Sequence, residues 1–345
     1  LRPVALVLLP TPNARPTAPR ARAEAAMESD GRSSLPSGVV EDDVVLFGVP
    51  KKGRIYEDVM KLLKGSGLDA HRPERLDVAM CKELPVKLVF LPAADIPSYV
   101  MEGDVDLGIS GNDMLEETLV GAGSVQDPPM KILQHLGLGK CRLCLQAPKA
   151  LHATDPRVFV GKRIVTSFPH LSRRFFDGLA AEGEARTAIK VVSGSVEAAC
   201  GLGLADAVVD LVETGTTMHA AGLEVVGEPI FTSEALLFQQ TPTERNGLGG
   251  GRKAEIIKTI VQRIDGYLTA TRFVMLIYNC HSDNLQNCCQ ITPGKRSPTI
   301  TELKESGWFS VSALVKKERQ NAIMDELSKN GAQDILCLNL QNTRM

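Results

Sequence analysis

The stretch of sequence that decides the fold is residues 204–222, LADAVVDLVETGTTMHAAG. Residues 207–212 are apolar and β-branched, as in a buried strand, but Asp206 and Asp210 interrupt this pattern. A carboxylate at such a position needs a ligand or a cation as partner, because an unpaired buried charge is too costly. The spacing of four residues puts both acids on the same face of a strand.

A turn of small and hydroxyl-bearing residues follows this strand and leads into a predicted helix. It consists of Glu213, Thr214, Gly215, Thr216 and Thr217. Such a turn exposes backbone N–H groups at a helix N-terminus, where a phosphate binds well. Together the acids and the turn predict a site for a phosphorylated ribose. The alternative is that the two acids are ordinary turn and cap residues.

Composition narrows the class of protein before any motif is considered. The 345 residues, 43% hydrophobic and 23% charged, suggest a globular chain of about two domains. A net charge of −2 and an aromatic content of 4% argue against nucleic acid or an anionic membrane as partner. The eight cysteines are irregularly spaced, which indicates a reducing compartment rather than a disulfide framework. No apolar run is long enough for a membrane span.

The first 43 residues are rich in Pro, Ala, Arg and Ser and are predicted to form a disordered extension. We interpret Met27 as the start of the translated chain, which implies a cytoplasmic protein. The alternative is a plastid transit peptide, because four arginines precede the first acidic residue, Glu24.

Strands and helices alternate from residue 44 onward, which predicts an α/β fold. Each predicted strand ends in a loop containing Gly or Asp, so ligand-binding loops are expected at the strand carboxyl ends. We predict a two-lobed region over residues 44–245. Lobe I comprises 44–141 and 225–245, and lobe II comprises 142–224.

The rest of the chain, residues 252–345, has the pattern βαββαβ after a first amphipathic helix. This order is typical of a ferredoxin-like module. It contains no strong catalytic arrangement, so a regulatory or assembly role is expected.

A basic loop at residues 50–54, PKKGR, follows the first predicted strand. Its cations Lys51, Lys52 and Arg54 surround a glycine, which suits a polyphosphate. The alternative is an ordinary solvated loop, and the sequence of a P-loop is absent.

Two further acids are candidates. Asp113 begins a predicted helix and is either a ligand to Mg²⁺ or a helix cap. Glu197 follows the turn at residues 193–195 and either lies beside a ligand or complements the helix dipole. In contrast, His135, His152 and His219 lack ligand spacing and are predicted to be structural.

These motifs occur together, in this order, in one family. Residues 50–54, 95–97 (DIP), 106–111 (DLGISG), 139–143 (GKCRL), 193–197 (SGSVE) and 206–217 resemble ATP phosphoribosyltransferase. The resemblance extends from residue 44 to residue 345, and residues 88–97 (LVFLPAADIP) are similar to the fungal members. It implies two lobes similar to type II periplasmic binding proteins, a C-terminal ferredoxin-like domain, and assembly into dimers and hexamers.

The resemblance also implies an activity. Members condense ATP, through adenine N1, with phosphoribosyl pyrophosphate to give phosphoribosyl-ATP and pyrophosphate, the first step of histidine biosynthesis. They use Mg²⁺, and L-histidine inhibits the long form by binding the C-terminal domain.

The roles implied for individual residues fall into four groups. The catalytic residues would be Asp210, Glu197 and Arg54. The substrate-binding residues would be Lys52, Asp206, Glu213, Thr214, Gly215, Thr216 and Thr217. Asp113 would serve the metal. Histidine would contact Asn279, Ser297, Thr299 and Asp334.

Some features depart from the family or leave other functions open. Ala93 and Ala94 stand where many members have a basic residue, and Asn279 replaces an acidic residue of some relatives. The rival interpretations are a two-lobed solute-binding protein without catalysis and a phosphoribosyltransferase that acts on a free base.

Overall fold

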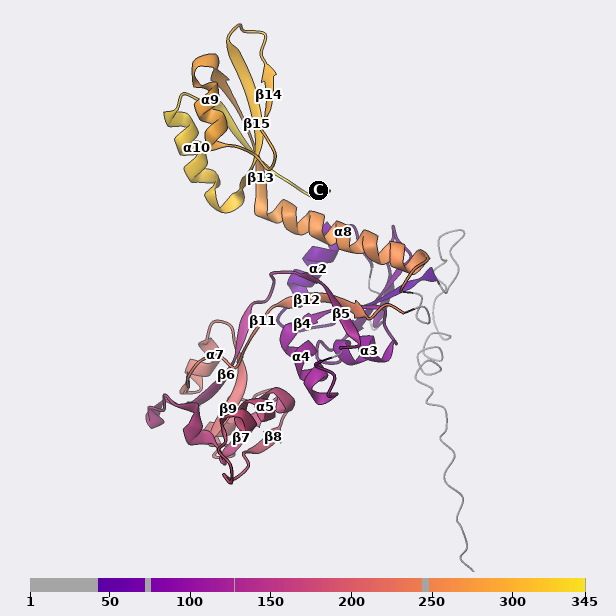
Figure 1. Cartoon of the computed structure of the whole chain (residues 1–345), viewed down its shortest axis with the longest axis vertical. Coiled ribbons are helices and arrows are strands. Elements are labelled where there is room, and N and C mark those ends of the chain that lie inside the picture. Colours follow the sequence, from indigo (N-terminus) through magenta and orange to yellow (C-terminus); the bar gives the residue numbers. More distant parts are fainter. Residues whose placement is uncertain (1–42, 72–75, 127, 244–247, 345) are drawn as a thin grey trace, which may run out of the picture. The chain divides into compact units, whose positions relative to one another are not determined.

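The computed structural model describes residues 43–71, 76–126, 128–243 and 248–344, all of which belong to one unit, Pro36–Met345. The predicted disordered extension therefore lies, up to residue 42, outside the described residues, as does the predicted boundary at residue 245. Strands and helices alternate along the chain (Figure 1), which confirms the α/β class. Within the described ranges, no helix is long and apolar enough to cross a membrane.

The first sheet has six strands in the order β2-β3-β1-β4-β12-β5. Its parallel centre consists of β3 (Val86–Leu91), β1 (Val45–Pro50) and β4 (Leu107–Gly111). Antiparallel strands complete it: β2 (Val78–Met80), β12 (Ala235–Gln240) and β5 (Met130–His135). Because parallel strands end at the same edge, the loops after β1, β3 and β4 gather there.

Helices cover this sheet on both faces. On one face α2 (Tyr56–Gly65) and α8 (Arg252–Arg272) share a core with Phe47 of β1. On the other face lie α3 (Ile96–Glu102) and α4 (Asn112–Gly121).

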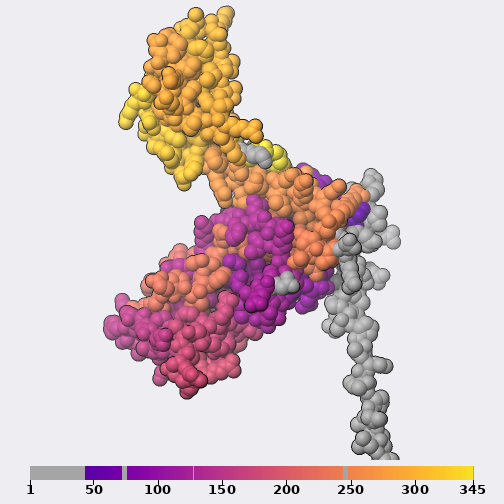
Figure 2. Space-filling model, viewed as in Figure 1, coloured from indigo at the N-terminus to yellow at the C-terminus, as the bar shows by residue number. Residues whose placement is uncertain are grey.

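Helix α8 differs from the prediction, which assigned residues from 252 onward to the C-terminal domain. The buried side of α8 packs into the core of the first lobe through Ile256, Ile257, Ile260, Ile264 and Leu268. Figure 2 shows the orange atoms of α8 against the indigo atoms of the first lobe. The helix is therefore part of this lobe as well as the connection to the C-terminal domain.

The second sheet has the order β10-β6-β9-β7-β8, and β11 also pairs with β6. Its strands are β6 (Cys141–Pro148), β7 (Arg163–Thr166), β8 (Ala188–Val191), β9 (Ala207–Val212), β10 (Leu223–Val225) and β11 (Phe231–Ser233). Its helices are η2 (Lys149–Leu151), η3 (Pro156–Phe159), α5 (Pro169–Leu179), α6 (Ala198–Gly201) and α7 (Thr216–Ala220).

The point of return to the first sheet also differs from the prediction, which placed it at residue 225. Strands β10 and β11 both bond antiparallel to β6, so the chain leaves the second sheet only after Ser233. The two sheets are joined by residues 136–140, between β5 and β6, and by Glu234, between β11 and β12.

The C-terminal domain consists of β13 (Phe273–His281), α9 (Ser282–Ile291), β14 (Thr299–Glu302), β15 (Trp308–Lys316), η4 (Lys317–Arg319), α10 (Gln320–Lys329) and β16 (Gln333–Asn339). Its antiparallel sheet has the order β14-β15-β13-β16. Alternate residues of β13, including Tyr278, are buried together with side chains of α9 and α10. Figure 1 shows these two helices on the same side of the sheet. This arrangement confirms the predicted ferredoxin-like module.

Candidate functional site

Asp210 lies near the carboxyl end of β9, between β6 and β7. Its Oδ1 accepts a hydrogen bond of 2.8 Å from the backbone N–H of Leu211. The side chain is half-buried, and burial raises its pKa to about 6, against the lowering effect of the Leu211 bond. The nearby Glu197 carboxylate raises this pKa further. Two of the predicted catalytic residues therefore lie close together.

The backbone before Glu197 has an unusual conformation. Gly194 and Ser195 both have positive φ, 99° and 50°. A positive φ is uncommon for serine, and residues in such strained conformations cluster at active sites and ligand-binding loops. The turn at residues 193–195 thus places Glu197 at the start of α6, within electrostatic reach of Asp210.

The predicted phosphate turn, residues 213–217, follows β9 directly. Gly215 has a φ of 82° and precedes α7, and the hydroxyl oxygens of Thr214 and Thr216 are 2.9 Å apart. The side chains of Glu213, Thr214, Thr216 and Thr217 are exposed. The turn therefore offers hydroxyl groups and the first N–H groups of α7 to an anion.

Asp206 is not part of this arrangement. It lies just before β9, where the Arg163 guanidinium donates to both of its oxygens at 2.8 and 3.2 Å, and the Arg163 backbone N–H adds a third bond. These bonds hold its pKa down at about 2. Asp206 and Asp210 are on the same face of the strand, but four residues along a strand correspond to about 13 Å. Asp206 therefore lies near the amino end of β9, and Asp210 lies near its carboxyl end. The prediction of a joint sugar site with Asp210 is therefore corrected.

The basic loop leads from β1 into α2. Lys52 and Arg54 are exposed, whereas Lys51 forms an ion pair with Asp77 at 3.6 Å. The Arg54 guanidinium donates a hydrogen bond to the carbonyl oxygen of Gly139, in the segment between β5 and β6. Arg54 is therefore held at the connection between the two sheets.

A cavity of about 530 Å³ lies at this connection. Its walls come from the ends of β5, β9 and β11 and from the starts of β6 and α4: Asn112, His135, Lys140, Cys141, Arg142, Val212, Glu213, Thr232, Ser233 and Glu234. Burial raises the pKa of the Cys141 thiol, and charges on Arg54, Asp113 and Glu213 all act on it. Three predicted residues that are distant in sequence therefore meet around Cys141.

Asp113 lies at the N-terminal end of α4 and is only 2% exposed. Its Oδ1 accepts a hydrogen bond of 2.7 Å from the Ser233 hydroxyl, whose oxygen accepts one of 3.0 Å from the Asp113 N–H. Among the described residues no group of three His, Cys, Asp or Glu side chains could hold a metal ion.

The prediction missed a hydrogen-bonded pair in the cavity wall. Nδ1 of His135 lies 2.7 Å from Oε1 of Glu234, which joins the end of β5 to the residue between β11 and β12. His135 was interpreted as structural because it has no ligand spacing. Only the pairing of β5 with β12 brings the two residues together, so the sequence carries no local signal for them.

The four residues assigned to histidine fall into two groups. The Asn279 amide donates a hydrogen bond of 3.0 Å to Oδ2 of Asp334, which has a φ of 51°. Thr299 lies on β14, which β15 separates from β13, and Ser297 is exposed in the preceding loop. The structure thus pairs Asn279 with Asp334 and places the other two at the far edge of the sheet.

Fold and site together define a class of protein. A two-lobed α/β region carries a hydroxyl-rich turn at a helix start, a half-buried acid beside it, and a basic loop that reaches the connection between the lobes. This combination is that of a transferase acting on a phosphorylated sugar.

Comparison with known proteins gives the family. A family model described as "ATP phosphoribosyltransferase" matches residues 92–266, and its C-terminal domain model matches residues 270–342. ATP phosphoribosyltransferase of Kluyveromyces lactis is 42% identical over 306 residues, 88% of this chain and 98% of its own. That of Schizosaccharomyces pombe is 44% identical over 313 residues, with 88% and 97% covered. The chain belongs to the ATP phosphoribosyltransferase family, the pentosyltransferases of the first step of histidine biosynthesis.

A solved structure supports the fold. The ATP phosphoribosyl transferase (HisG:HisZ) complex from Thermotoga maritima contains a chain with a TM-score of 0.51 and 24% identity. The match covers 64% of this chain and 99% of that one.

Proposed function

We propose that this chain joins ATP to phosphoribosyl pyrophosphate by attack of adenine N1 on C1 of the sugar, with pyrophosphate as leaving group. The observation that supports this most directly is Asp210, a half-buried acid whose strand continues into the exposed hydroxyl turn. The attack needs no covalent intermediate. Catalysis then comes from holding the reactants in line and neutralising the charge that develops on pyrophosphate.

Each group of the sugar substrate has a partner in this proposal. The 5-phosphate binds the turn of residues 213–217, and the ribose hydroxyls bind the Asp210 carboxylate. Lys52 and Arg54 face the pyrophosphate, since they carry the exposed charges of the basic loop. Glu197 lines the nucleotide region, and Asp206 is left out because Arg163 occupies it.

Mg²⁺ is part of the proposal, because divalent metals generally serve this class of enzyme. Mg²⁺ keeps several waters and binds through one or two carboxylates plus substrate phosphates, which fits the single buried Asp113. When bound, it would neutralise charge on the pyrophosphate. Removing divalent ions with a chelator should abolish turnover, and added Mg²⁺ should restore it.

The decisive experiment is to mix the purified chain with ATP, phosphoribosyl pyrophosphate and Mg²⁺ and to follow phosphoribosyl-ATP by its absorbance. Product formation supports the proposal. Ligand binding without product would instead support a solute-binding protein, and turnover of a free base without ATP would support another phosphoribosyltransferase.

Regulation by L-histidine and assembly into dimers and hexamers in the cytoplasm are also proposed. Asn279 and Asp334, which are hydrogen-bonded to each other, would bind the inhibitor in the C-terminal domain, whereas Ser297 and Thr299, at the far edge of the same sheet, are assigned to it by the family resemblance alone. Added L-histidine should lower the rate, and light scattering with and without it should show the change in assembly. An unchanged rate would reject this part of the proposal while leaving the reaction intact.

The glycine of the phosphate turn gives a specific prediction. Gly215→Ala should raise the KM for phosphoribosyl pyrophosphate about tenfold, because left-handed backbone costs a residue with a Cβ about 1–2 kcal/mol. The new Cβ would also lie 3.3 Å from Nε2 of His219. The matched control is Gly222→Ala. Gly222 also has a positive φ, 71°, but an added Cβ there would have no atom within 4 Å, and the variant should leave the KM unchanged. Equal KM values for both variants would contradict the role of the turn.

A further inference from the structure

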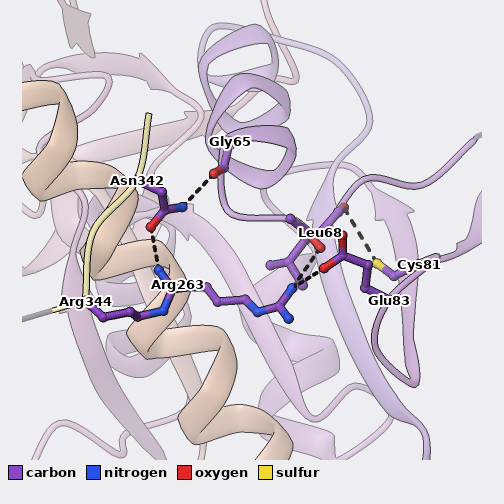
Figure 3. Close-up of polar contacts among 8 residues, drawn as sticks. Gly65, Leu68, Cys81, Glu83, Arg263, Asn342 and Arg344 are labelled. Atoms are coloured by element: carbon purple, nitrogen blue, oxygen red, sulfur yellow. Dashed lines mark hydrogen bonds and ion pairs between the residues drawn. The ribbon is translucent and has the colours of Figure 1, made fainter. Parts of the chain in front are cut away.

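The C-terminal end of α2 is completed by parts of the chain that are far away in sequence. Three of its last carbonyls, those of Leu62, Leu63 and Lys64, accept hydrogen bonds from the N–H groups of residues 66–68. The next carbonyl, that of Gly65, accepts a bond of 2.9 Å from the side-chain amide of Asn342. A helix end needs partners for its last carbonyls, so Asn342 acts as a cap from another domain (Figure 3).

The tail that carries Asn342, residues 342–344, is seated in a notch of α8. A Cβ added at Gly266 of α8 would collide with the carbonyl oxygen of Thr343. The Asn342 carboxamide oxygen accepts a bond from the Arg344 guanidinium (Figure 3) and another from the Thr343 N–H, and the two bonds fix the direction of its amide. The tail therefore needs a glycine at position 266 to reach α2.

A second notch lies on α2 itself. A Cβ added at Gly65 would collide with the ring of Tyr267, the residue after Gly266. One turn earlier in α8, Arg263 donates to the Gly67 carbonyl at 3.2 Å and to Oε2 of Glu83 at 2.8 Å (Figure 3). Helix α2, helix α8 and the tail thus meet at one junction, at residues 65–67.

Two features connect this junction to the functional regions. The tail continues β16, the strand on which Asp334 lies. At its other end, α2 starts directly after the basic loop, and the Tyr56 N–H donates to the Gly53 carbonyl at 3.2 Å. A rigid helix therefore links the tail to Lys52 and Arg54.

The junction also contains a group without a partner. The Ser66 hydroxyl is 2% exposed and makes no hydrogen bond. A buried hydroxyl without a partner costs free energy, so this point of the junction is less stable than the hydrogen-bonded residues beside it.

We propose that residues 342–344 form a strap that couples the C-terminal domain to the basic loop through α2. Bound L-histidine acts on the basic loop only through the seated strap, so a chain whose strap has left the Gly266 notch is active but insensitive to L-histidine. This inference rests on the proposed regulation by L-histidine, because it names the route by which an inhibitor bound at Asn279 and Asp334 affects the basic loop.

Two variants of the full chain test the strap by different means. Asn342→Ala removes the amide that caps Gly65. Gly266→Ala leaves the tail sequence intact but fills its notch, and alanine is the better helix former. The control is Gly178→Ala in α5, a helical glycine with no atom within 4 Å of an added Cβ. Melting temperatures and light scattering verify that all three variants are folded and assembled.

The first measurement is inhibition of phosphoribosyl-ATP formation by L-histidine. Asn342→Ala and Gly266→Ala should raise the half-inhibitory concentration at least fivefold, the lower end of typical coupling factors. Turnover without histidine should stay within about twofold of the wild type. Gly178→Ala should match the wild type in both.

The second measurement is deuterium exchange, which does not depend on histidine. Both strap variants should speed exchange at residues 65–68 and also at residues 51–56. If both strap variants showed the inhibition of the wild type and also its exchange rate at residues 51–56, the proposed coupling through the strap would be wrong. If the wild-type chain forms phosphoribosyl-ATP but is not inhibited by L-histidine, the proposed regulation is wrong. Exchange at residues 51–56 would then decide by itself whether the tail is coupled to the basic loop.

Discussion

Asp210→Asn should make the enzyme much slower and the fold more stable at the same time. Loss of the carboxylate charge at the proposed ribose contact should lower kcat/KM for phosphoribosyl pyrophosphate about 100-fold or more, a loss typical of one removed charged contact at a reacting centre. The wild-type rate should also fall as the pH drops through about 6, where Asp210 takes up a proton.

The stability change has the opposite sign because burial raises the pKa of Asp210 from 3.8 to about 6. The folded state holds this proton more tightly than the unfolded chain, so ionisation at neutral pH disfavours folding. Asparagine has no charge to bury, so the Asp210→Asn variant should have a free energy of unfolding about 2–3 kcal/mol higher than the wild type at pH 7. The gain should be complete above pH 6 and should vanish as the pH falls to about 4.

Denaturant unfolding between pH 4 and pH 7, together with steady-state kinetics, measures both effects. The matched control is Asp206→Asn, four residues earlier, where Arg163 holds the carboxylate in its charged form. This variant should lose stability and keep its kinetics. Equal kinetics for Asp210→Asn and the wild type would reject the assigned role of Asp210.

Arg54→Ala should have a comparably large effect on turnover. Its guanidinium is anchored on the Gly139 carbonyl and acts on the cavity around Cys141. Removing one preorganised donor from a site of developing charge lowers kcat by about 100- to 1000-fold. Arg54→Lys should recover only part of the rate, because an ammonium cannot present two donors in a planar fork.

Lys51→Ala provides the control within the same loop. Lys51 forms an ion pair with Asp77, so its loss should change kcat by less than about tenfold. Pyrophosphate binding measured by calorimetry should weaken with Arg54→Ala and remain close to the wild type with Lys51→Ala. The reverse order of effects would show that Lys51, and not Arg54, faces the leaving group.

Much of the fold could be predicted because local patterns carry it. Apolar strands followed by glycine-containing loops and amphipathic helices indicated the α/β class, and the last segment read directly as βαββαβ. The edge strands β2 and β5 were not predicted, since β2 has three residues and β5 lacks clear alternation of buried and exposed positions. The partners of β10, β11 and α8 depend on long-range pairing, which no local pattern encodes.

The residues of the candidate site also fall into those that local motifs indicate and those that only long-range pairing brings together. The turn after β9, Asp210 and Glu197 could be found because each lies in a short motif with a physical reason for its residue types. The ion pair of Asp206 with Arg163 could not be predicted, because Arg163 is distant in sequence and belongs to the neighbouring strand β7. His135 and Glu234 were missed for the same reason.

The connection between the two sheets has a consequence for synthesis of the chain. Strands β1 to β5 emerge from the ribosome first, but their sheet lacks β12 until residue 240 has been made, and its core lacks α8 until residue 272. The second sheet has all its strands once residue 233 is available. Of the two lobes, the one that is begun first is therefore completed last, and a chain cut after residue 234 would contain every strand of the second lobe but leave an open sheet edge on β4.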